Sequence, residues 1–168
     1  MSNRTSPPAP TSSSGTLPPT PLSLSRNGIA FIQRHEGYRA TIYSDSAGYP
    51  TIGYGHLIKP GEAFNHGITR EQASELLAQD TKTSLDAVNA RVTISLTQTQ
   101  FDALVDFTYN LGSRALNRST LLKNLNSGIP VILKNFTDWN RAAGKAIPGL
   151  TRRRTEEFNL FSRGEYGS

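Results

Sequence analysis

The stretch that most restricts the fold lies between residues 34 and 56 and reads "RHEGYRATIYSDSAGYPTIGYGH". Its short pieces alternate apolar with polar residues, and glycine or proline separates them, which is typical of a small antiparallel sheet with tight turns. We expect this sheet to occupy residues 38–66. The sequence on both sides has the three- and four-residue spacing of helices. The chain must therefore place a compact sheet between helical segments.

A helix is expected immediately before the sheet. Ser23 or Ser25 can cap its N-terminus, and Gly37 can end it, because glycine readily adopts the backbone conformation that follows a last helical turn. Ile32 and Glu36 are four residues apart and share one face of this helix. A carboxylate therefore extends an apolar stripe and lies at the junction with the sheet.

Signals of further helices follow the sheet. "TREQ" at 69–72 and "TQTQ" at 97–100 are capping boxes, in which Thr and Gln satisfy free backbone N–H groups. They predict one long helix over residues 70–90 and a second helix that begins near residue 98. "GLTRRRTEEFNLF" at 149–161 predicts a last amphipathic helix. The residues alone thus predict one helix, a small sheet, a long connecting helix and a helical bundle.

The N-terminus differs in composition from the rest of the chain. Residues 1–22, "MSNRTSPPAPTSSSGTLPPTPL", are almost entirely Ser, Thr and Pro. Such a segment cannot bury enough apolar surface to offset the entropy that is lost on ordering. We expect a disordered leader over residues 1–22 and one folded domain over residues 23–168, which is long enough for a single hydrophobic core.

Composition excludes several classes of site. The 168 residues include no cysteine, which excludes disulfides, thiolate metal ligands and a cysteine nucleophile. The three histidines lack the spacing of metal ligands, so we expect no metal and no cofactor. No apolar run is long enough for a transmembrane helix, and no signal peptide or membrane anchor is visible. The net charge of +5 favours polyanionic partners.

Glu36, Asp45 and Thr51 form a candidate catalytic set. Hydrolysis of a glycosidic bond needs a carboxylic acid that protonates the leaving oxygen and a carboxylate that activates water or attacks the sugar. Glu36, at the end of an apolar stripe, suits the acid, because burial disfavours the charged form. Asp45, in a polar turn, suits the second role, and the Thr51 hydroxyl can hold a water. From the residues alone, Asp45 in "SDSAG" can equally be only a turn residue.

Four motifs, taken in order, resemble the phage-type lysozymes, which are the endolysin muramidases of tailed phages. The motifs are the Glu–(8 residues)–Asp–(5 residues)–Thr spacing, "ITREQASELLAQD", "TQTQFDALVDFTYNLG" and "GLTRRRTEE". The resemblance covers about residues 25–162. It implies a two-lobed α+β fold, in which a small antiparallel sheet lobe and a helical lobe are joined by a long helix.

The same resemblance implies an activity. Phage-type lysozymes are glycoside hydrolases that cleave the β-1,4 bond between N-acetylmuramic acid and N-acetylglucosamine in peptidoglycan and so lyse the bacterial wall. By this resemblance Glu36 is the acid, Asp45 is the second carboxylate and Thr51 positions the water. A water held on the far face of the sugar predicts inversion at the anomeric carbon.

The resemblance also implies substrate-binding residues. Leu57, Tyr109 and Thr120 match positions that line the saccharide cleft in the family. A C-terminal arginine is expected to pair with Glu36. The register leaves three candidates open, Arg152, Arg153 and Arg154, of which we prefer Arg153.

A structural ion pair is expected between His56 and Asp80. Ala73, Leu77 and Asp80 share one face of the 70–90 helix, so Asp80 points inward, where an unpaired carboxylate is unfavourable. His56 closes the sheet segment. Family relatives resemble this arrangement, with a histidine after "G-x-G" that pairs with an aspartate on the connecting helix. We expect the pair to raise the pKa of His56.

Partners and location follow from the same reasoning. We expect the protein to bind peptidoglycan glycan strands, with the anionic outer-membrane surface as a further candidate partner for a basic protein. We expect no nucleic acid partner, because the arginines at 152–154 share a helix with Glu156 and Glu157. We expect a monomer that stays in the host bacterial cytoplasm until a holin releases it to the periplasm.

Two other functions compete with hydrolysis. A lytic transglycosylase needs one glutamate and no water-activating carboxylate, so Asp45 and Thr51 argue against it. A non-catalytic peptidoglycan-binding domain can be built on a lysozyme fold. Loss of Glu36 or Asp45 would indicate such a domain, and both residues are present.

Overall fold

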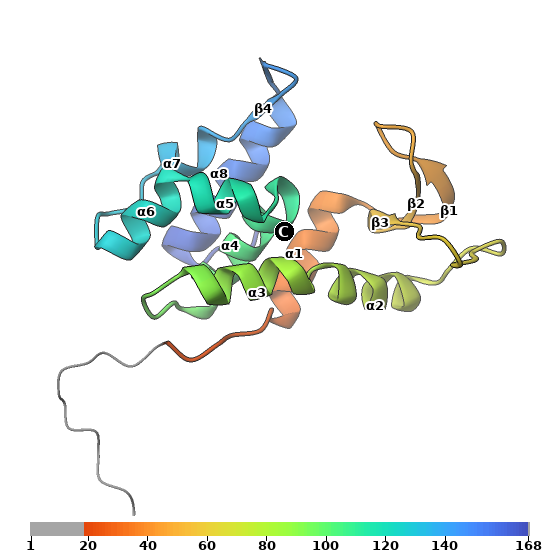
Figure 1. Ribbon diagram of the computed structural model, residues 1–168, viewed down its shortest axis with the longest axis horizontal. Coiled ribbons are helices and arrows are strands. Elements are labelled where there is room, and N and C mark those ends of the chain that lie inside the picture. Colours follow the sequence, from red (N-terminus) through yellow and green to blue (C-terminus); the bar gives the residue numbers. More distant parts are fainter. Residues whose placement is uncertain (1–18, 168) are drawn as a thin grey trace, which may run out of the picture.

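The computed structural model describes residues 19–167 and has the two lobes expected from the sequence (Figure 1). A small sheet lies on one side of the molecule, and most helices gather on the other. In chain order the elements are α1 (Arg26–Glu36), β1 (Arg39–Ser44), β2 (Pro50–Gly53), β3 (His56–Leu57), α2 (Arg70–Asp80), α3 (Lys82–Arg91), α4 (Gln98–Leu111), α5 (Ser113–Arg118), α6 (Thr120–Ser127), α7 (Leu133–Thr137), β4 (Arg141–Ala142), β5 (Lys145–Ala146) and α8 (Pro148–Arg163). Within residues 19–167 no helix is both long and apolar enough to cross a membrane.

The predicted start and end of the first helix are confirmed. The Ser25 hydroxyl accepts a hydrogen bond from the Gly28 N–H at 2.9 Å and caps α1. Gly37 ends the helix with a φ of 76°, a conformation that few other residues adopt without strain. Both predicted capping boxes are also present, at the starts of α2 and α4. Local signals therefore fix where α1, α2 and α4 begin.

The prediction of a single long helix over residues 70–90 is wrong in one respect, because the helix is interrupted at Thr81. This residue has a ψ of −8° and separates α2 from α3, which follow one another along one side of the molecule (Figure 1). The Thr81 hydroxyl donates to the Ala78 carbonyl at 3.0 Å. In a continuous helix that oxygen would accept from the N–H of Lys82. A side chain thus competes with the backbone for an acceptor and breaks the helix.

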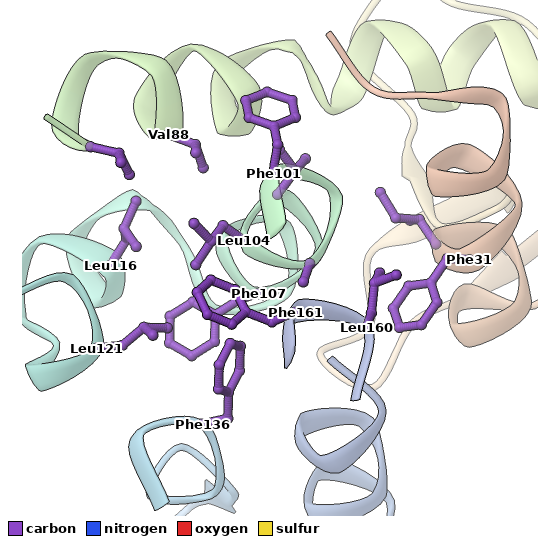
Figure 2. Close-up of a cluster of buried hydrophobic side chains, with 14 of the residues drawn as sticks. Phe31, Val88, Phe101, Leu104, Phe107, Leu116, Leu121, Phe136, Leu160 and Phe161 are labelled. Atoms are coloured by element: carbon purple, nitrogen blue, oxygen red, sulfur yellow. The ribbon is translucent and has the colours of Figure 1, made fainter. Parts of the chain in front are cut away.

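Helix α4 forms the centre of the helical lobe. It is buried without interruption from Phe101 to Thr108, and α8 packs along it. Figure 2 shows Phe107, Phe136 and Phe161 meeting in this core. The ring centres of Phe107 and Phe136 lie 5.8 Å apart in an edge-to-face contact, a favoured arrangement for aromatic pairs. Burial of these apolar side chains, each worth about 1.5–3 kcal/mol, stabilises the lobe that supports the end of α1.

The sheet is a three-stranded antiparallel meander in the order β1-β2-β3. Thr51 lies in the central strand, directly opposite Tyr43 on β1 and Leu57 on β3. Helix α2 packs against β2 and β3. The catalytic candidate Thr51 is therefore held from both sides by neighbouring strands.

His56 links the sheet to α2. Its Nδ1 lies 2.8 Å from Asp80 Oδ2, as the sequence predicts, and its Nε2 lies 2.9 Å from Glu62 Oε1. The imidazole is only 4% exposed. Burial alone would lower the pKa of His56, but the hydrogen bonds with Glu62 and Asp80 outweigh it and raise that pKa. The second carboxylate, Glu62, was not predicted, because it lies in a loop without a regular pattern.

The folded domain begins slightly earlier than residue 23. The Leu22 N–H donates to the side-chain oxygen of Asn89 at 3.0 Å, and the Asn89 amide donates back to the Leu22 carbonyl at 2.9 Å. Leu22 also packs against the core. Residues 1–18 of the predicted leader lie outside the described residues. Its last part, residues 19–22, is held against α3 through the hydrogen bonds of Leu22.

His56→Asn should destabilise the protein, because asparagine cannot satisfy both Glu62 and Asp80. Removing one partner of a buried ion pair costs about 3–5 kcal/mol, and we expect the lower end because Asp80 is 20% exposed. Urea unfolding near pH 6 measures this loss. His66→Asn, at an exposed position, is the matched control and should leave the free energy of unfolding unchanged.

The loss caused by His56→Asn should also depend on pH. Because the folded pKa of His56 is raised, its stabilisation is complete below the unfolded value of about 6.5 and disappears as pH rises through the folded pKa. The backbone N–H of Lys59 and then His56 lower the pKa of Glu62, so its contribution disappears as pH falls through that lowered value. A difference between wild type and variant that is constant from about pH 3 to 9 would contradict this account.

Truncation should distinguish the two parts of the predicted leader. Deleting residues 1–18 should leave the free energy of unfolding unchanged, because their composition supplies little apolar surface to bury. Deleting residues 1–22 removes two hydrogen bonds to Asn89, each worth about 0.5–1.5 kcal/mol. Equal stability of the two truncated proteins in urea would show that the Leu22 contact contributes nothing.

Candidate functional site

Glu36 lies at the last position of α1, where the helix meets the sheet lobe. Its side chain is 20% exposed. A Cβ placed on Gly55 would lie only 3.1 Å from Glu36 Oε1, so the turn between β2 and β3 approaches the carboxylate closely. Gly55 is therefore a site residue that sequence reasoning missed. The "GYG" turn was visible in the sequence, but its contact with α1 was not.

Arg153 holds the other oxygen of Glu36. Its Nη2 donates to Glu36 Oε2 at 2.9 Å, and its Nε and Nη2 donate to Asp106 at 2.9 and 2.7 Å. Of the three arginines left open by the sequence, Arg153 is thus the one in contact with Glu36. Arg154 instead turns to Glu157, with Nη2 at 2.7 Å from Oε2, and Arg152 is exposed.

Asp106 sets the electrostatics of this contact. Its burial alone would raise its pKa, but the Arg153 guanidinium outweighs burial and lowers the pKa of Asp106 to about 2. The fully buried Asp106 is therefore ionised at neutral pH and compensates the charge of Arg153. When Glu36 carries the proton that an acid needs, Arg153 is still paired. The arginine can then orient Glu36 in both protonation states.

Asp45 closes a turn, which is one of the two functions considered for it. Its Oδ1 accepts from the N–H groups of Ala47 and Tyr49 at 2.9 and 2.8 Å, which closes the turn after β1. These bonds engage one carboxylate oxygen, and within residues 19–167 no protein group is bonded to Oδ2. One oxygen thus fixes the side chain, and the other is available to accept a hydrogen bond from a water or a substrate.

The Thr51 hydroxyl is oriented by a hydrogen bond to the backbone. Its hydroxyl donates to the Tyr49 carbonyl at 2.9 Å, and the residue is only 2% exposed. Because the hydroxyl proton is used in this bond, the oxygen retains only acceptor capacity. Asp45, in the turn after β1, and Thr51, on β2, therefore each keep an oxygen that can accept a further hydrogen bond.

The remaining predicted binding residues lie at different distances from this centre. Leu57 is 52% exposed and lies opposite Thr51 across the sheet. Tyr109 is half-buried near the end of α4, and burial and then the Glu36 carboxylate raise its pKa. Thr120 is exposed at the start of α6 in the helical lobe. Within residues 19–167 no hydrogen bond joins Thr120 to the catalytic candidates.

No metal centre accompanies the site in the described part of the chain. Between residues 19 and 167, no group of three or more His, Asp or Glu side chains is arranged to hold an ion. The polar groups of the candidate site are the Glu36 and Asp45 carboxylates, the Thr51 hydroxyl and the Arg153 guanidinium. A carboxylic acid can donate a proton, and a hydroxyl oxygen can accept a hydrogen bond from a water.

Known proteins are similar to this chain in sequence and in fold. The phage lysozyme family model matches residues 33–157. The endolysin of Salmonella phage P22 is 40% identical over 144 residues, which cover 83% of this chain and 98% of that protein. The endolysin of Bacillus phage B103 is 39% identical over 150 residues, 86% of this chain, but the chain spans only 56% of that relative's length.

A solved structure agrees with the sequence matches. The endolysin from Escherichia coli O157:H7 phage FAHEc1 superposes with a TM-score of 0.80 at 37% identity, over 88% of this chain and 98% of that one. The family model covers most of the chain, and the P22 relative aligns over nearly its whole length. The chain therefore belongs to the phage lysozyme family.

Proposed function

We propose that this protein hydrolyses the β-1,4 bonds between N-acetylmuramic acid and N-acetylglucosamine in peptidoglycan and thereby lyses bacterial walls. The observation that carries the proposal is the Arg153–Glu36 contact of 2.9 Å, made where the end of α1 meets the β2–β3 turn of the sheet lobe. The same lobe bears Asp45, in the turn after β1, and Thr51, on β2. An acid held by a buried arginine, beside a second carboxylate and a hydroxyl, is what acid-catalysed glycoside hydrolysis requires.

The proposed reaction is a single displacement. Glu36 protonates the glycosidic oxygen as the bond breaks, and a water held by Asp45 and Thr51 attacks the anomeric carbon from the opposite side. Asp45 takes one proton of this water, while Thr51 accepts a hydrogen bond from the other. The leaving sugar departs as an alcohol, so protons and electrons balance without a cofactor.

Delivery and partners complete the proposal. The protein acts as a monomer on glycan strands, and its net charge of +5 favours contact with the anionic outer-membrane surface. It remains in the host cytoplasm until a holin admits it to the periplasm, as the family resemblance implies. Residues 1–22 take no part in catalysis, so a protein without them should cleave purified wall at the parent rate.

Mass spectrometry of digested, purified peptidoglycan tests the function. Reducing muramic acid ends are the expected products of hydrolysis. Anhydro ends would identify a lytic transglycosylase instead. Intact glycan with retained wall binding would identify a non-catalytic domain.

Glu36→Gln should abolish lysis while the fold survives. The amide can still accept a hydrogen bond from Arg153, but it cannot donate the proton, and general-acid catalysis is worth ~10²–10⁴-fold. Initial lysis rates and thermal melting of the same samples measure the two effects. The exposed Glu75→Gln on α2 is the matched control and should keep full activity. Activity of Glu36→Gln above about a tenth of the parent rate would remove Glu36 from the acid role.

The reaction should invert the anomeric carbon. Room for a water between sugar and Asp45 requires carboxyl groups roughly 6.5–9.5 Å apart, whereas a covalent intermediate requires ~5–5.5 Å. Proton NMR of the first products distinguishes the α from the β anomer before they equilibrate. Initial release of the β anomer would show retention and would contradict the role of Thr51.

A further inference from the structure

Strand β1 contains an irregularity that positions one tyrosine. Arg39 pairs with Gly53 and Tyr43 pairs with Thr51, so the paired positions are four residues apart on β1 but only two apart on β2. Such bulges bend a strand and re-aim its side chains, and they are frequent beside active sites. In this bend the Arg39 guanidinium lies 4.4 Å from the centre of the Tyr43 ring. A cation–π contact thus holds the ring in place.

The register places Tyr43 on the catalytic face of the sheet. Tyr43 and Thr51 are directly paired on antiparallel strands. Residues paired in this way project from the same face, with Cβ atoms about 4.5–5.5 Å apart. Tyr43 therefore projects beside Thr51 from the same face of the sheet. Asp45 follows Tyr43 by two positions and closes the adjoining turn.

The surroundings of Tyr43 keep its hydroxyl protonated. Burial, and then the carboxylates of Glu36 and Asp45, raise the pKa of this phenol, while Arg39 opposes them. The geometry agrees, because Tyr43 is paired with Thr51 and lies two positions before Asp45 in the chain. A phenol with a raised pKa is a neutral hydrogen-bond donor over the whole working pH range.

The hydroxyl of Tyr43 is not used by the described part of the fold. Two other tyrosines use theirs for structural bonds, since Tyr38 donates to the Ile68 carbonyl at 2.9 Å and Tyr166 donates to Asp102 at 2.7 Å. Between residues 19 and 167 no protein group forms such a bond with the Tyr43 hydroxyl. Its donor is available to a ligand that lies between the two catalytic carboxylates.

We propose that Tyr43 is a further catalytic residue, whose hydroxyl donates a hydrogen bond to the reacting sugar between Glu36 and Asp45. This inference rests on the proposed glycoside hydrolase function. The glycan strand is held by contacts along the whole cleft, whereas Tyr43 acts at the bond that breaks. Loss of its hydroxyl should therefore reduce kcat more than it raises KM.

Tyr43→Phe tests the proposal, because it keeps the ring and its contact with Arg39 and removes only the hydroxyl. On peptide-free glycan strands of defined length, kcat should fall about tenfold, the usual effect of losing one neutral hydrogen bond. KM should stay within about twofold, and the melting temperature should not change. Tyr49→Phe, at a 62% exposed position in the same turn, is the matched control and should keep the parent kcat.

The outcomes separate this inference from the proposed function. If wild type cleaves the strands and Tyr43→Phe cleaves equally fast, only the role of Tyr43 is overturned. If wild type does not cleave, the proposed function fails and the inference fails with it. Reduced activity that matches a reduced folded fraction in circular dichroism would make the residue structural and overturn the proposal.

A binding measurement tests the catalytic assignment separately from turnover. In the Glu36→Gln background, calorimetry should give the same affinity for a glycan fragment with and without Tyr43→Phe, within about twofold. A tenfold loss of affinity would assign Tyr43 to ground-state binding and would also overturn the proposal.

Discussion

The buried guanidinium of Arg153 is the contact on which the rest of the site depends. It joins three helices, because it binds Glu36 on α1 and Asp106 on α4 from its own position on α8. Removing one partner of such a buried pair costs about 3–5 kcal/mol, since the other charge is left without compensation. The packing of α8 along α4 holds the arginine in place. The helical core thus determines where Arg153 holds the Glu36 carboxylate.

The two lobes supply different kinds of groups to the site. The helical lobe provides a side chain in a rigid position, at the end of α1. The sheet lobe contains Asp45 in the turn after β1 and Thr51 on β2, and local hydrogen bonds hold both side chains. Gly55 shows how closely the lobes approach, because any side chain there would meet Glu36. The site is therefore assembled where two independently supported pieces of backbone meet.

Much of the fold could be predicted because its signals are local. Ser25 and Gly37 determine the limits of α1 through bonds within a few residues, and the capping boxes do the same for α2 and α4. Contacts between distant positions left no comparable signal. Asp106 lies in an apolar helix and meets Arg153 across 47 positions, and Glu62 reaches His56 from a loop. The family resemblance predicts Glu36, Asp45 and Thr51 as the catalytic set, and the structure adds that Asp106 pairs with Arg153 and that Gly55 closely approaches Glu36.

The interruption at Thr81 lies between two helices that pack on different lobes. Helix α2 packs on the sheet and α3 packs on α4. At their junction the fully buried Thr81 hydroxyl donates to the Ala78 carbonyl. The chain thus leaves the helical lobe at Gly37, directly after Glu36, and returns to it at Thr81. The whole sheet lobe is therefore an insertion between two single-residue joints, and only the first of them adjoins a catalytic candidate.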